Sequence, residues 1–212
     1  MNTATPVIPP AVPAVVLLIL AAACLMFWLL VRQSTRGRRR IELREWAAAN
    51  RFSILWDPPL PNSLRLLAAI AARPRCLLSH DQTMLVELEL FGREGPRRAH
   101  LLVRAIGAHW PMTVLRPAAL SFSALDPLGL AELAPMAQGD RFVMYGRDRA
   151  AAAALQKSQI RGLLPADVGL ALLEGYMVLD FSARPFDPVS LWRIDALAEQ
   201  LAAHLPAPTL TS

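Results

Sequence analysis

The sequence predicts an α+β fold, in which an N-terminal transmembrane helix precedes one mixed, mainly antiparallel sheet domain with flanking helices. Residues 12–31 are apolar throughout. Residues 84–105 alternate apolar and polar side chains on both sides of a glycine-containing loop, as a β-hairpin does. The other predicted strands and helices lack the regular alternation of a doubly wound sheet. The 212 residues therefore suffice for one membrane segment and one domain.

The predicted membrane segment is residues 12–31, which follow a short extracytoplasmic N-terminus, residues 1–11. No charged side chain occurs in residues 1–31. Twenty helical residues at about 1.5 Å each span about 30 Å, the thickness of the hydrocarbon core of a bilayer. Trp28 lies near the end of the segment, where an indole suits the membrane interface. These features predict a single-pass anchor.

A basic juxtamembrane segment, residues 32–44, sets the predicted orientation. It holds the six arginines Arg32, Arg36, Arg38, Arg39, Arg40 and Arg44, and none precedes the apolar segment. By the positive-inside rule, the chain lies in the inner (cytoplasmic) membrane with its N-terminus outside. The α+β domain, residues 45–206, is then cytoplasmic, and residues 207–212 form a frayed tail.

The basic character of the chain belongs mostly to this segment. Of the 22 basic and 17 acidic residues, six and two fall in residues 32–45, so the rest of the chain has 16 basic and 15 acidic residues. Such a balance lacks the electrostatic footprint of a nucleic-acid-binding protein. The expected partners are the lipid bilayer and other membrane or cytoplasmic proteins, and nucleic acid is not among them.

Cys24 leaves a second processing route open. It follows Ala21, Ala22 and Ala23, which loosely resembles a bacterial lipobox, and a lipidated Cys24 would make the chain a lipoprotein. The position of the usual leucine holds Ala21, and an apolar stub up to Val31 would remain. The transmembrane interpretation is therefore preferred.

The first half of the domain predicts a helix, a strand and a second helix before the hairpin. Residues 41–50 favour a short helix ended by Asn50, and residues 52–56 favour a strand. A proline-rich turn over 57–61 leads to a helix from Ser63 to about Ala72, stopped by Pro74.

The hairpin joins strands 84–91 and 98–105 through the loop around Gly92 and Gly95. If Phe91 pairs with Pro96, the register places Glu89 opposite Arg98 and Glu87 opposite His100. The sequence then predicts opposite charges that meet on the exposed face of the sheet.

The second half predicts mostly strands and helices separated by prolines. In chain order they are a strand near Met112, a strand over 141–145, a helix from Asp148 to about Leu163, a helix over 166–173, a strand over 176–181 and a helix capped by Asp187 that ends near Leu205. The last helix repeats apolar residues at helical spacing after Pro188.

No catalytic, metal or cofactor motif emerges from the residues. The four histidines lack ligand spacing, there is no CxxC pair, and the single lysine, Lys157, excludes a P-loop. Ser79, His80 and Asp81 combine the chemistry of a triad, but neighbours on a strand point apart, so we assign them no catalytic role. No cofactor is expected.

One turn is the candidate ligand contact. Tyr145, Gly146, Arg147 and Asp148 lie between a strand and a helix N-terminus, where free N–H groups can meet an anion. An ordinary strand-to-helix turn explains the same residues and is the favoured interpretation.

The layout resembles a group of uncharacterised bacterial, planctomycete-like single-pass membrane proteins with a cytosolic α+β domain. The residues that carry the resemblance are Glu45 to Phe52 after the basic segment, Arg141 to Asp148, and the last amphipathic helix. The resemblance implies no activity.

The sequence therefore favours a membrane-tethered cytoplasmic domain that acts as a non-enzymatic interaction or scaffold module. A ligand-binding or enzymatic domain with an unrecognised site is the alternative.

Overall fold

The computed structural model describes residues 11–61, 72–92, 95–126, 130, 133 and 135–206. The predicted helix that begins at Ser63 and the predicted tail 207–212 lie outside these residues, as do the side chains of 11–19 and 29–36. The chain divides into two compact units, residues 1–43 and 44–212.

Helix α1 (Ala11–Ala49) is continuous. The separate helix predicted over 41–50 is therefore wrong as a distinct element, because the basic segment before it is also helical. Within the described part of the chain, no helix has both the length and the apolar character needed to cross a membrane. Of the predicted segment 12–31, only Leu20 to Trp28 have described side chains, and all of them are exposed.

The end of α1 is a Schellman-type cap built on Arg51 instead of glycine. Arg51 has a φ of +62°, and the N–H groups of Arg51 and Phe52 donate to the carbonyls of Ala48 and Ala47 at 3.4 and 2.8 Å. This geometry satisfies carbonyls at the helix end and turns the chain into the first strand.

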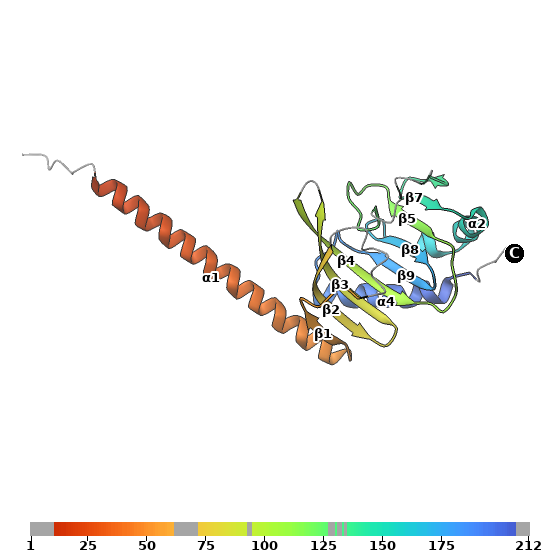
Figure 1. The fold of residues 1–212 in the computed structure, drawn as a ribbon, viewed down its shortest axis with the longest axis horizontal. Coiled ribbons are helices and arrows are strands. Elements are labelled where there is room, and N and C mark those ends of the chain that lie inside the picture. Colours follow the sequence, from red (N-terminus) through yellow and green to blue (C-terminus); the bar gives the residue numbers. More distant parts are fainter. Residues whose placement is uncertain are drawn as a thin grey trace, which may run out of the picture. The chain divides into compact units, whose positions relative to one another are not determined.

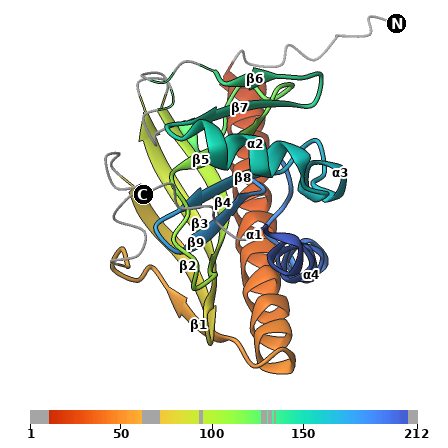
Figure 2. The same ribbon diagram turned by 90° about the vertical axis from the view of Figure 1, so that its right-hand side faces the viewer.

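Within the described residues, nine strands form one antiparallel sheet in the order β1-β2-β3-β4-β9-β8-β5-β7-β6 (Figures 1 and 2). The predicted α+β class with a mainly antiparallel sheet is confirmed. The strands are β1 (Ser53–Trp56), β2 (Ala72–His80), β3 (Thr83–Gly92), β4 (Gly95–Ala105), β5 (Thr113–Pro117), β6 (Ala137–Gln138), β7 (Phe142–Gly146), β8 (Gly169–Leu173) and β9 (Tyr176–Asp180).

The hairpin β3–β4 has the predicted register, with Glu89 opposite Arg98 and Glu87 opposite His100. The predicted exposure of that face is wrong for the second pair. Glu87 and His100 are only 5% and 7% exposed. The rings of Phe181 and Phe186 pack against His100 at centroid distances of 5.7 and 5.4 Å.

Two strands replace structures that the sequence analysis had assigned otherwise. Residues 166–173 were expected to be helical, but Gly169–Leu173 is strand β8, and all five of its residues are buried. A short apolar run buried on both faces lacks the two-residue period that marks a strand. Pro74, which was predicted to stop the helix that lies outside the described residues, is part of β2. It lies beside an irregularity in the pairing with β3, where β1 no longer pairs with β2.

The helix predicted from Asp148 to Leu163 is two helices, α2 (Arg149–Lys157) and α3 (Ile160–Leu163). Ser158 breaks it, because its extended backbone ends α2 and its hydroxyl donates to the carbonyl of Leu155 at 2.7 Å. The last helix, α4 (Pro188–His204), begins as predicted, with the Asp187 carboxylate accepting the N–H of Ser190 at 2.8 Å.

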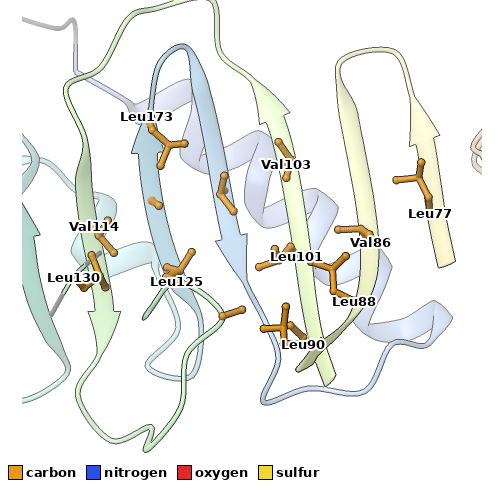
Figure 3. Close-up of a cluster of buried hydrophobic side chains, with 14 residues drawn as sticks. Leu77, Val86, Leu88, Leu90, Leu101, Val103, Val114, Leu125, Leu130 and Leu173 are labelled. Carbon is orange, nitrogen blue, oxygen red and sulfur yellow. The ribbon is translucent and has the colours of Figure 1, made fainter. Parts of the chain in front are cut away.

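The sheet buries apolar side chains on both faces. Helix α4 lies behind the sheet in Figure 1 and contacts β4 and β9, and it buries Leu191, Ile194, Ala198 and Leu201. The other face carries a cluster that includes Val86, Leu101 and Val178 (Figure 3). Ala124, Leu125 and Leu130, from the segment between β5 and β6, complete that cluster.

A buried carboxylate ties this segment to the sheet. Asp180, at the end of β9, is 1% exposed. One of its oxygens accepts the hydroxyl of Ser123 and the N–H of Ala124, at 2.6 and 2.7 Å. The other accepts the N–H and the hydroxyl of Ser182, and the same hydroxyl accepts the N–H of His100 at 3.0 Å. Asp180 therefore joins β9, β4 and the covering segment.

We expect Asp180→Ala to lower the free energy of unfolding by about 3 kcal/mol or more, because it leaves several buried donors without an acceptor. Asp148→Ala, which removes only the N-cap of α2, should cost about 1 kcal/mol. Urea unfolding of both variants measures the difference. Equal losses would show that the Asp180 network contributes no more than a helix cap.

Candidate functional site

The predicted ligand turn is split between three environments. Tyr145 packs against the buried apolar cluster, and the side chain of Arg147 is exposed. Asp148 caps α2, with one carboxylate oxygen accepting the N–H groups of Ala150 and Ala151 at 2.7 and 2.9 Å. The chain therefore satisfies the first donors of α2 itself, and an anion would have to be held by side chains.

A pocket of about 490 Å³ lies beside Gly146; we call it the α2 pocket. One wall is a single face of α2, with residues at helical spacing, and the facing wall comes from β7 and the residues around β6. Its lining residues are Pro135, Met136, Ala137, Met144, Gly146, Arg149, Ala152, Ala153 and Gln156. Of the predicted turn, Gly146 alone lines it.

Seven of the nine residues that line the α2 pocket are apolar residues or glycine, and the other two, Arg149 and Gln156, are polar and lie at its two ends along the helix. Arg149 and Gln156 are exposed and lie seven residues apart, which is about 10 Å along a helix. A second hollow of about 370 Å³ shares Gln156 and is also lined by Arg141 and Arg161. Small-molecule sites usually combine apolar side chains with a few placed polar groups, and the residues of the α2 pocket are of both kinds.

The buried pair Glu87 and His100 lacks the access that catalysis requires. His100 Nδ1 lies 2.7 Å from the carbonyl of Arg184, which makes Nδ1 a donor. Its Nε2 lies 3.8 Å from a Glu87 carboxylate oxygen and has no hydrogen-bond partner among the described residues. Because both side chains are almost fully covered, we assign the pair a structural role.

The Ser79, His80 and Asp81 side chains do not form a relay. The Ser79 hydroxyl is 2.7 Å from that of Ser53 on β1, and His80 Nε2 is 3.3 Å from the exposed carboxylate of Asp81. Within the described ranges, no group of three or more His, Cys, Asp or Glu side chains is placed to hold a metal ion.

The outer face of α4 carries two large exposed apolar side chains. Val189 and Trp192 are 58% and 61% exposed and lie about one helical turn apart. The inner face of the same helix is buried, so α4 carries apolar side chains on both its faces. Large exposed apolar residues of this kind often mark an interaction surface.

The sequence analysis missed both surfaces. The helix spacing of Arg149, Ala152, Ala153 and Gln156 was readable, but the opposite wall from Met136 and Met144 depends on the pairing of β6 with β7. Val189 and Trp192 precede and follow Leu191, which is buried, and their place outside the apolar stripe could have been noted from the helical period.

No family model matches the chain, and no curated protein matches its sequence. Among solved structures, the crystal structure of the mycobacterial trehalose monomycolate transport factor A, TtfA, is similar. Its TM-score is 0.60 at 10% identity, over 83% of this chain and 98% of that chain. This similarity shows the fold, and the planctomycete-like resemblance remains a prediction.

The stability of the folded domain should depend on pH through the carboxyl group of Asp195 on α4. Burial raises the pKa of its carboxyl group, and Arg104 opposes this while Glu199 adds to it. A carboxyl group with a higher pKa in the folded chain binds more protons when folded, so stability falls as pH rises above the unfolded value of about 3.9.

We therefore expect Asp195→Asn to be more stable than the natural chain at pH 7, with a difference that shrinks as the pH approaches 4. Urea unfolding across that range measures it. A difference that is constant with pH, or that favours the natural chain at pH 7, would contradict the assignment.

Proposed function

We propose that this chain is a membrane-tethered, non-enzymatic interaction module, with its α+β domain at the cytoplasmic face of a bacterial inner membrane. The tether is supported by the apolar residues 12–31 and by the six arginines in 32–44. The exposed apolar side chains of Leu20 to Trp28 are of the kind that lipid would cover. Each arginine near an anionic surface adds about 1 kcal/mol of attraction.

The exposed pair Val189 and Trp192 is the observation that carries the interaction role. Tryptophan is enriched among the residues that contribute most binding energy at protein interfaces. The helix beneath the pair is anchored by five buried residues, so the surface is held rigidly without a partner. A folded domain that offers such a face is suited to docking.

The partner that we propose is a protein in the same membrane. A tether confines the domain to the membrane surface, where its effective concentration toward other membrane proteins is high. The solved structure with a similar fold is named a transport factor, and an accessory role beside a membrane protein is compatible with that name.

The orientation is tested by reporter fusions at the C-terminus of the full chain. A reporter active only in the periplasm should be inactive there, and a cytoplasmic fluorescent reporter should be bright. Strong periplasmic activity would overturn the proposed orientation.

The docking face is tested by placing a photo-crosslinking amino acid at position 192 of the full chain in cells. We expect crosslinks to the same membrane protein in replicate experiments, and we expect Trp192→Ala to lower its co-purification by tenfold or more, about 1.4 kcal/mol. Position 200, an exposed glutamine on the same helix, is the control. Crosslinks to soluble proteins only, or equal effects of Trp192→Ala and Gln200→Ala, would refute the proposal.

A further inference from the structure

We infer that the α2 pocket binds a single-chain amphiphile with an anionic head group. Its apolar chain lies against Met136, Met144 and Ala152, and its head group lies on Arg149. This site is independent of the proposed docking face on α4.

The lining selects an apolar chain. Met136 and Met144 bring flexible thioether side chains to one wall, and methionine adapts its shape to irregular apolar ligands. On the other wall, Ala152 and Ala153 keep the face of α2 short, so the hollow exists because α2 has methyl groups where longer side chains would fill it. The volume of about 490 Å³ lies within the range of small-molecule pockets.

The depth of the hollow also depends on the glycine at the end of β7. A Cβ atom placed on Gly146 would lie 3.1 Å from the carbonyl oxygen of Met112 and 3.4 Å from the sulfur of Met136. A larger residue here would therefore press on Met136 and alter the wall. Of the candidate turn, Gly146 contributes to the site, because the absence of a side chain at this position leaves the hollow open.

The charge at the edge of the pocket selects an anionic head group. Arg149 forms no salt bridge with any described residue. Residues 140–162 include five basic side chains against two acidic ones, Asp140 and Asp148. The nearly neutral domain therefore has a local positive excess beside this pocket. An anion that binds here gains charge-assisted hydrogen bonds from a guanidinium.

The head group has to be held by Arg149, because the helix N-terminus is already occupied. The carboxylate of Asp148 accepts the N–H groups of Ala150 and Ala151. A ligand that relies on free helix N–H groups, such as a small phosphate, finds none at these positions. An amphiphile adds apolar contact with the pocket wall, which a free phosphate lacks.

The test uses the full chain reconstituted in phosphatidylcholine vesicles and a palmitic acid that carries a diazirine on its chain. After irradiation, mass spectrometry of the peptides locates the crosslinks. We expect them on residues 135–156, at Met136 and Met144 above all. The matching diazirine-labelled fatty alcohol, which has no charge, should label these residues about tenfold less.

Two arginine variants separate the site from surface charge. Arg149→Gln should lower labelling about tenfold, whereas Arg147→Gln, which removes the same charge from an exposed residue outside the lining, should leave it unchanged. Ala153→Trp should abolish labelling by filling the pocket at an exposed position. Thermal unfolding by circular dichroism verifies that each variant is folded.

Equal losses in the two arginine variants, equal labelling by acid and alcohol, or crosslinks confined to other segments would overturn the inference. The Trp192→Ala variant should be labelled by the diazirine fatty acid to the same extent as the natural chain. If position 192 crosslinks to no membrane protein while the fatty acid still labels the α2 pocket, the proposed function is refuted and this inference stands. If position 192 crosslinks to a membrane protein while labelling of the pocket fails, this inference is refuted and the proposed function stands.

Discussion

The pairing of β4 with β9 is the constraint on which the rest of the structure depends. It joins the strands of residues 53–105 to those of 113–180, so that one sheet forms from two sets of strands (Figure 1). The register places Leu101 opposite Asp180 on one side of β9 and Gly169 opposite Asp180 on the other. Asp180 then binds the segment that covers the apolar cluster. A Cβ atom on Gly169 would lie 2.9 Å from Leu125, so a glycine in β8 is what allows that segment to approach.

The positions of both candidate surfaces depend on the pairing of β4 with β9. Helix α4 crosses β4 and β9, and burying one of its faces on them leaves Val189 and Trp192 on the other. The α2 pocket is lined by residues of α2 on one side and by residues of β7 and around β6 on the other. Figure 2 shows where these three elements lie in the ribbon. The strands of this pocket reach the rest of the sheet only through β5, β8 and β9. Each of the two proposed surfaces therefore depends on strand pairings far from its own residues.

The sequence predicted the features that depend on interactions between residues close together in the chain. The hairpin register was readable because a short loop sets it, and the caps at Asp148 and Asp187 were readable because their side chains bond to their own helices. The burial of His100 could not be predicted, because Phe181 and Phe186, which pack against its ring, lie more than 80 residues away in the sequence. The buried run Gly169–Leu173 has no period to separate strand from helix. The candidate turn lay beside the pocket, but Arg149 and the methionine wall required knowledge of how β6 pairs with β7.

Native-state hydrogen exchange on the full chain tests the role of the β4–β9 pairing most directly. If the β4–β9 pairing holds the sheet together, the paired amides of Leu101–Ala105 and Tyr176–Asp180 exchange only through global unfolding. The amide of Ala124, bound to Asp180, should then have the same free energy of opening. If instead β5, β7, β8 and β9 open together at a much lower free energy while β2, β3 and β4 stay protected, the two sets of strands are separable. That result would contradict the central role of the β4–β9 pairing.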